Sequence, residues 1–282
     1  MNKKSSRHHY IPQFLIKGFY NEKNKVFVYD IQKDEILPDT KSSKSVLFEW
    51  DRNTFIDIYG EENSMIEDLL FKKWDNNASK IIKKFQTNSL PDNDLLSTNN
   101  IADFVMFTIQ LFWRIPYTDL SSEYMIQNAK INSENSDELK NNEGFKMHQR
   151  TMLYQETISN FSKIQRKTKG FFAKIFELEK DIFVLGDNPI LYQSTPSTFE
   201  DLYDMDNMIA LTPRRIFTNS LKEIDSFGFS NALEYNHFVI SQSKRFVCSN
   251  DKNLLEASVK YHKNVSNLSI EENLRKELFN KK

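Results

Sequence analysis

The sequence holds one cysteine, few glycines and prolines, and no long apolar run. Cys248 has no second cysteine to pair with inside the chain, and a chain of 282 residues can bury a core without a disulfide. With 6 glycines and 7 prolines, no glycine-rich loop of the dinucleotide or Walker type occurs. No window reaches the roughly 20 apolar residues that span a bilayer, and no apolar stretch follows the polar N-terminus as in a secretory signal. We therefore expect a cytoplasmic protein that has no membrane segment.

An excess of charge of one sign is also missing. Lys and Arg total 38 against 39 Asp and Glu, which gives a formal net charge of -1 and removes any whole-chain argument for steering nucleic acid. A net charge near zero still allows a local basic patch. Metal-ligand spacings of the C-x-x-C or H-x-x-x-H kind are absent, so the sequence assigns no metal ligands. The cofactor is left unknown, with a divalent metal open but without a ligand motif.

Aromatic residues are abundant, with 23 Phe and 11 Tyr, and the hydrophobic patterns predict both helices and strands. Strand alternation predicts an N-terminal hairpin over 25–36, and an extended stretch over 45–50 is a candidate to pair with it. Helical spacing predicts helices from 64 to about 85, over 101–115 before Pro116, and over about 148–167.

The second half of the chain alternates between short strands and helices. Strands are predicted over 171–178, 181–185, 207–211 and 216–219, and helices over 230–243, 253–260 and 270–282. We therefore predict an α+β fold with a mixed or antiparallel sheet that includes the N-terminal hairpin and packs against a largely helical layer. Residues 1–282 are expected to form a single domain, with a polar, mobile insertion near 121–144 and a peripheral helical tail over 268–282.

The opening segment has the densest group of chemically capable side chains. His8 and His9 precede Pro12 and Gln13, and histidine serves as a general acid, general base or metal ligand near neutral pH. Adjacent residues of an extended chain point to opposite sides, so only one of the histidines enters any one site, and we favour His9. The structural alternative is a frayed terminus, a tag remnant or a hydrogen-bonded core histidine.

Three further groups are candidates. Asp187 and Asn188 end an apolar strand before Pro189, where catalytic acids occur but where ordinary turn residues also occur. Gln110 and Arg114 lie one turn apart on the apolar helix that ends before Pro116. A charge there needs a carboxylate partner, for which Asp187 is a candidate, or an anionic ligand.

The last group follows a later strand. Arg214 and Arg215 lie beside Pro213, where they either clamp phosphate or form solvated surface charge. Asn236 and His237, on the next predicted helix, add polar groups whose direction the sequence leaves open.

Several of these residues also belong to an ordered set of short motifs that resembles a known family. The segment His9-Tyr10-Ile11-Pro12-Gln13, the pattern Q-x-x-x-R-x-P from Gln110 to Pro116, and Gly186-Asp187-Asn188-Pro189 occur in this order, followed by Leu211-Thr212-Pro213 and Asn236. In these landmarks the chain resembles the uncharacterised family catalogued as domain of unknown function 4238, over roughly residues 7–250. That family usually has Ser where this chain has Gly186. The resemblance implies no established activity.

Two classes of function fit these residues. The leading hypothesis is a nuclease or phosphodiesterase-like effector that acts on nucleic acid in bacterial or phage conflict, with His9, Asp187 and Gln13 as catalytic residues. In that hypothesis Arg114, Gln110, Asn188, Arg214 and Asn236 bind the substrate. The alternative is a non-enzymatic module that binds an anion or a nucleotide, or an interaction subunit that contacts a protein partner through the polar insertion.

Overall fold

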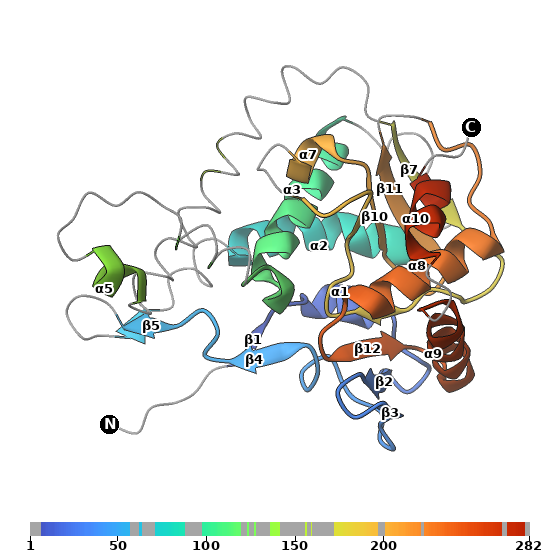
Figure 1. The fold of residues 1–282 in the computed structure, drawn as a ribbon, viewed down its shortest axis with the longest axis horizontal. Helices are drawn as coiled ribbons and strands as arrows, with labels where there is room; N and C mark the ends of the chain where they lie inside the picture. The colour runs from blue at the N-terminus through green and yellow to red at the C-terminus, as the bar shows by residue number, and fades with distance from the viewer. Residues whose placement is uncertain are drawn as a thin grey trace.

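The computed structural model is built from helices and antiparallel sheets, so the predicted α+β fold is confirmed (Figure 1). The residues that the structure describes are 7–56, 62–63, 71–87, 98–119, 123, 127, 136–141, 156, 159, 172–196, 201–220, 223–266 and 270–279. Apart from isolated positions, the helix predicted over 148–167 lies outside them, as does most of the segment 121–144. Within that segment the structure describes the short helix α5 (Ser136–Asn141).

The strands predicted for the second half form a four-stranded antiparallel sheet. In spatial order its strands are β7 (Phe172–Glu177), β11 (Arg215–Ser220), β10 (Asn207–Ala210) and β9 (Leu191–Tyr192). Three of them confirm the strands predicted over 171–178, 207–211 and 216–219. The fourth, β9, has too few residues for an alternating pattern to reveal it.

Helices α2 (Lys72–Thr87) and α3 (Thr98–Arg114) cover one face of this sheet. The ring centre of Phe217 in β11 lies 4.0 Å from that of Phe104 in α3. Arg215, two residues earlier in β11, donates to the carbonyl of Phe85 in α2. Because alternate residues of a strand point to one face, both helices lie on the same side of the sheet.

The opposite face is covered by α8 (Phe229–Gln242), which matches the helix predicted over 230–243. The hydroxyl of Tyr235 in α8 accepts the backbone N–H of Ala210 in β10 at 2.9 Å. Just before the helix, the ring of Phe227 lies 5.7 Å from that of Phe176 in β7. The register of β7 with β11 places Phe176 on the face away from α2 and α3, so the sheet lies between two helical layers.

The N-terminal hairpin predicted over 25–36 is confirmed, and it joins strands from much later in the chain. The second four-stranded sheet has the order β3 (Glu35–Ile36), β2 (Phe27–Asp30), β12 (Phe246–Ser249) and β8 (Leu185–Gly186). The apolar run that contains Cys248 is therefore an interior strand. Cys248 is fully buried, and burial raises the pKa of its thiol, so it is a core residue.

The extended stretch over 45–50 does not pair with this hairpin, so that prediction is wrong. Its strand, β4 (Phe48–Trp50), pairs instead with β1 (Arg7–His9), which is the opening segment itself. Strand alternation identifies an extended segment but does not identify its partner, because the partner is set by tertiary packing.

The strand predicted over 181–185 is wrong in its first four residues, since only its last residue, with Gly186, forms β8. The backbone N–H of Val184 donates to the side-chain oxygen of Asn236 at 3.1 Å. The two residues before it both donate to the carbonyl of Pro213. These partners satisfy the backbone without a ladder, so an apolar run alone could not distinguish this segment from a strand.

Two helices complete the C-terminal part of the fold. The helix α9 (Lys252–Ser266) is longer than the predicted 253–260, and α10 (Glu271–Phe279) lies within the predicted stretch 270–282. Both pack against α8. The remaining short elements are α1 (Gln13–Lys17), β5 (Phe55–Ile56), β6 (Glu62–Asn63), η3 (Pro116–Thr118) and α7 (Asp201–Asp204).

Candidate functional site

The opening segment forms a two-stranded ribbon of β1 and β4. The register pairs Arg7 with Trp50, His8 with Glu49, and His9 with Phe48. Because side chains alternate, Arg7 and His9 lie on one face of the ribbon and His8 lies on the other. His8 is buried, and its Nδ1 accepts the backbone N–H of Asn53 at 2.9 Å. His8 is therefore a structural residue, and only His9 shares the face of Arg7.

That face carries a row of aromatic and cationic side chains, Arg7, His9, Phe48 and Trp50, which we call the aromatic face. The ring centre of Phe48 lies 5.6 Å from those of His9 and Trp50. The guanidinium carbon of Arg7 lies 5.0 Å from the Phe48 ring centre and 4.9 Å from that of Trp50, and its Nη1 donates to the carbonyl of Lys44. Trp50 is 55% exposed, so the outer end of the row is open to solvent.

His9 is half-buried on this face. Its imidazole makes a hydrogen bond with the backbone of Ser43, whereas its Nε2 is buried and has no hydrogen-bond partner among the described residues. Burial has the largest effect on the pKa of His9 and lowers it from 6.5, while the Ser43 bond opposes that shift. The positive charges of Arg114 and Arg7 lower the pKa further. The imidazole is therefore mainly neutral at pH 7.

Arg114, at the end of α3, connects three segments of the chain. Its Nη1 lies 2.7 and 2.9 Å from the two carboxylate oxygens of Asp75 in α2, and its Nη2 donates to the carbonyl of His9 at 2.9 Å. The residue is 4% exposed, and its guanidinium lies 4.4 Å from the ring centre of Phe71. The expected pairing of Arg114 with Asp187 is wrong, because Asp75 is the carboxylate that neutralises this charge.

Gln110 lies one helical turn before Arg114 and is 1% exposed. Neither its amide oxygen nor its amide nitrogen has a hydrogen-bond partner among the described residues. A buried amide in this state costs about 1–3 kcal/mol, and a buried water or a ligand group is its usual partner.

Gln13 begins α1 and is linked to His9 through Ser43. The hydroxyl of Ser43 donates to the side-chain oxygen of Gln13 at 3.3 Å, and the backbone of Ser43 is the hydrogen-bond partner of His9. The ring of Phe14, next in α1, lies 5.6 Å from that of Phe107 in α3. His9 and Gln13 are therefore both held close to α3.

Asp187 is held by backbone groups. Its carboxylate accepts the N–H groups of Lys244 at 2.9 Å, Arg245 at 2.7 Å and Phe246 at 3.1 Å. The residue is 3% exposed; burial raises the pKa of its carboxyl, and the three N–H bonds oppose that rise. These contacts fix the turn between α8 and β12, so the oxygens of Asp187 are engaged in holding the fold.

The packing around residue 186 explains why this chain has glycine there, where the family that it resembles usually has serine. A Cβ at this position would lie 2.7 Å from Cγ1 of Val239 and would overlap the hydroxyl oxygen of Ser243. That hydroxyl donates to the carbonyl of Val239 at 2.7 Å. The side chain of Ser243 thus fills the space that a side chain at position 186 would need.

Both candidate asparagines take part in backbone hydrogen bonds, Asn188 through its own carbonyl and Asn236 through its side chain. The carbonyl of Asn188 accepts the side-chain amide of Gln242 at 2.7 Å. The amide of Asn236 donates to the carbonyl of Ile182 at 2.6 Å, and its oxygen accepts the N–H of Val184. Asn236 is fully buried, so it satisfies the irregular segment before β8 rather than facing solvent.

The two arginines that follow Pro213 point in different directions. Arg214 has a side chain that is 53% exposed, and its Nε lies 2.5 Å from a carboxylate oxygen of Asp181. Arg215 is buried and donates to both carboxylate oxygens of Glu177 at 3.1 Å. Only Arg214 is therefore presented to solvent, and its charge is already paired.

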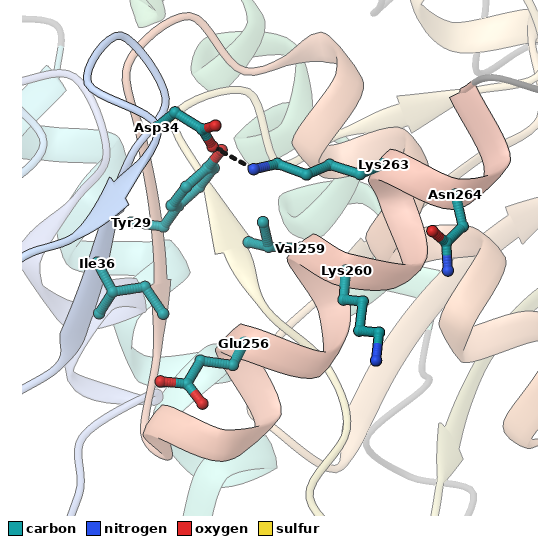
Figure 2. A pocket seen from close by; sticks show the side chains of 8 residues that line it. All are labelled: Tyr29, Asp34, Ile36, Glu256, Val259, Lys260, Lys263 and Asn264. Atoms are coloured by element: carbon teal, nitrogen blue, oxygen red, sulfur yellow. Dashed lines mark hydrogen bonds and ion pairs between the residues drawn. The ribbon is translucent and has the colours of Figure 1, made fainter.

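One cavity of about 310 Å³ lies between the hairpin and α9 (Figure 2). The hydroxyl of Tyr29 donates to Asp34 at 2.6 Å, and the ammonium of Lys263 lies 2.5 Å from the same carboxylate. Glu256 and Lys260 project from α9 at its border. No residue selected from the sequence lines this cavity, and its charged contacts tie the hairpin to α9.

Among the described residues, no group of three or more His, Cys, Asp or Glu is arranged to hold a metal ion. Within the same part of the chain, no helix is long and apolar enough to cross a bilayer.

A family model described as "Protein of unknown function (DUF4238)" matches residues 7–253. The chain belongs to this family. The DUF4238 match begins at β1 and ends in the first turn of α9, so it includes the aromatic face, Arg114 and the Asp187 turn, whereas α10 lies beyond it. No curated protein and no solved structure matches the chain significantly. The function of this DUF4238 protein must therefore be argued from its own residues.

The geometry changes the set of candidate residues. His9, Gln13 and Arg114 lie in one neighbourhood, whereas Asp187, Asn236 and Arg214 form separate contacts. The sequence hypothesis missed Phe48 and Trp50, although their spacing in the stretch 45–50 places them on one face of a strand.

Proposed function

We propose that this DUF4238 protein binds single-stranded nucleic acid on the aromatic face of its β1–β4 ribbon. The observation that carries the proposal is Trp50, which is 55% exposed and stands in line with Phe48 and Arg7. Exposed aromatic rings on a strand surface stack with nucleobases of any sequence, and arginine adds to such stacking. A bulky apolar ring so open to solvent has no role in the core.

The charges around the ribbon support the same proposal. Arg7 has no carboxylate partner among the described residues, so its guanidinium is free to contact a phosphate. The acid on the ribbon, Glu49, belongs to the opposite face by register and pairs with Arg52 at 2.6 Å. The aromatic face is therefore locally cationic although the chain as a whole is nearly neutral.

Hydrolysis of the bound strand is a second candidate function, and His9 favours it. A neutral imidazole can accept a proton from a water molecule that attacks a phosphodiester. Nε2 is buried in this structure, so the side chains that cover it must move before a strand can reach it. Asp187 and Gln13 already bond to other protein groups, so His9 carries this candidate. Such an activity would fit an effector of bacterial or phage conflict, whereas binding without hydrolysis fits the non-enzymatic alternative.

The binding proposal predicts that Trp50→Ala weakens the affinity for a fluorescein-labelled single-stranded oligonucleotide by roughly 5- to 150-fold, because base–aromatic stacking contributes about 1–3 kcal/mol per base. Fluorescence anisotropy titrations with DNA and RNA homopolymers measure this change. Phe229→Ala is the matched control, because Phe229 is 67% exposed and lies outside the ribbon. The proposal is wrong if the parent protein binds no oligonucleotide, or if Trp50→Ala binds as tightly as the parent.

The hydrolysis candidate is tested on the same oligonucleotides by gel electrophoresis. We expect His9→Ala to retain binding and to lose cleavage, because it removes the proton acceptor but leaves Trp50 and Arg7 in place. Equal cleavage by the parent and His9→Ala would remove His9 from the reaction, and no cleavage by either would assign the face to binding alone.

A further inference from the structure

Two histidines and a glutamate form a chain of contacts across three helices. Nδ1 of His237, in α8, lies 3.1 Å from Nδ1 of His262 in α9, and Nε2 of His237 lies 3.2 Å from Oε1 of Glu271 in α10. His237 is fully buried, and its Nε2 contact is not aligned as a hydrogen bond. Protonation of His237 would turn this contact into an ion pair, so these three contacting side chains are arranged to accept a proton.

Glu271 also lines a cleft of about 430 Å³ between α10 and the residues that follow β9. Arg275 lies on the same wall, with its guanidinium 4.5 Å from the ring centre of Phe238 and its Nη1 donating to the carbonyl of Tyr192 at 2.8 Å. Burial lowers the pKa of Arg275, while Tyr117 and Glu271 oppose that shift. Arg275 forms no ion pair within 4 Å with a carboxylate of the described residues, so its guanidinium can bind an anion.

The facing wall offers further donors. The backbone N–H and the hydroxyl of Ser194 lie 3.3 and 3.4 Å from the sulfur of Met205. A thioether is a weak acceptor, so an anion oxygen would compete effectively for these donors. The other cation of α10 at the cleft, Lys276, is already paired with Glu272 at 2.6 Å.

We propose that this cleft binds a small oxyanion between Arg275 and Ser194, and that the chain of His262, His237 and Glu271 takes up one proton when the anion binds. The site is independent of the aromatic face. It depends on α9 and α10, which lie largely or wholly beyond the part of the chain that matches the family.

The coupling follows from the position of Glu271. Its carboxylate lines the cleft and repels an incoming anion, and a positive charge on His237 offsets that repulsion. Because His237 is fully buried, the proton enters at the half-buried ring of His262, whose Nδ1 proton then moves to His237. The net change is one solvent proton bound, with the imidazolium of His237 next to Glu271.

The starting state is unprotonated near neutral pH. Burial is the main cause of the lowered pKa of His237 and of His262, and Glu271 opposes both shifts. The titratable and charged groups around His237 and His262 are Glu234 of α8, Tyr261 and Lys263 of α9, and Glu271 and Arg275 of α10. An anion placed beside Arg275 adds negative charge and therefore favours the protonated form.

Calorimetric titration of the full chain with sodium sulfate, at constant ionic strength, tests the proposal, because sulfate itself does not titrate in this range. We expect sulfate to bind more tightly at about pH 6 than at about pH 8, by at most about tenfold per pH unit, which is the limit for uptake of one proton. Repeating the titration in buffers with different heats of ionisation measures the proton uptake directly. Arg275→Gln should weaken binding by at least about tenfold, whereas Arg214→Gln, which removes an exposed charge that does not line the cleft, should leave it unchanged.

His237→Asn separates the coupling from the site, because His237 is the group that holds the extra proton at equilibrium. Asparagine does not titrate, so this variant should bind sulfate with a weaker pH dependence than the parent. Sulfate affinity that is unchanged in Arg275→Gln, or absence of sulfate binding by the parent, would overturn the site. Equal affinity of the parent at both pH values, with no proton uptake, would overturn the coupling, and this result does not require any variant to fold.

Discussion

Arg114→Ala is expected to lower the free energy of unfolding by about 3–5 kcal/mol, because removing one partner of a buried ion pair leaves the other uncompensated. Asp75 would lose both of its bonds to the guanidinium, and the carbonyl of His9 would lose its donor. The side chain of Asp75 is 24% exposed, so water reduces the loss toward the lower end of that range. Urea denaturation at neutral pH measures the change.

Arg214→Ala is the matched control, because its ion pair joins side chains that are 53% and 36% exposed. Exposed pairs contribute about 0–1 kcal/mol, so this variant should remain close to the parent. A loss of less than about 1 kcal/mol in Arg114→Ala would show that the Asp75 pair does not hold β1 and α2 to α3.

Asp187→Ala is expected to lower the free energy of unfolding by about 3 kcal/mol, because three partly buried backbone N–H groups lose their charged acceptor. The groups concerned belong to Lys244, Arg245 and Phe246. Asp181→Ala is the control, since Asp181 bonds to the exposed Arg214 and to Asn250 at the surface. Thermal and urea unfolding measure both variants.

The opposite result for Asp187 would also be informative. Residues placed for chemistry often cost little stability when they are removed, and some removals stabilise the protein. A stable Asp187→Ala protein that loses cleavage of nucleic acid would contradict the structural role and restore the catalytic hypothesis for this carboxylate.

The sequence predicts that Arg114 has a carboxylate partner, but it does not identify that partner. An arginine on a helix as apolar as 101–115 must be neutralised, and that requirement alone predicts a carboxylate partner. The identity of the partner depends on how α2 packs against α3, and no local pattern records that packing. The sequence therefore does not distinguish Asp75 from other acids along the chain, and the expected pairing with Asp187 is wrong.

Asp187 shows a similar limit. Its place before Asn188 and Pro189 is typical both of a turn and of a catalytic acid. The N–H groups that decide between them belong to residues 244–246, which only the pairing of β8 with β12 brings close. Local sequence fixes the strand end, but a distant strand supplies the partners.

Only part of the aromatic face can be predicted from the sequence. Phe48 and Trp50 are two residues apart in an extended stretch, so a shared face follows from strand geometry. That Arg7 and His9 lie opposite them follows from the pairing of β1 with β4, which is a tertiary contact. In the same way, His237 was visible as a polar residue on a predicted helix, whereas its contacts with His262 and Glu271 were not.

The most direct test of the aromatic face is a titration of tryptophan fluorescence with a single-stranded oligonucleotide. The chain has three tryptophans, of which Trp50 is 55% exposed and Trp113 is 2% exposed. Bases that stack on Trp50 should quench its emission, and Trp50→Ala should abolish this quenching. Saturable quenching that is lost in Trp50→Ala is the predicted result; no quenching, or equal quenching in Trp50→Ala, would contradict it.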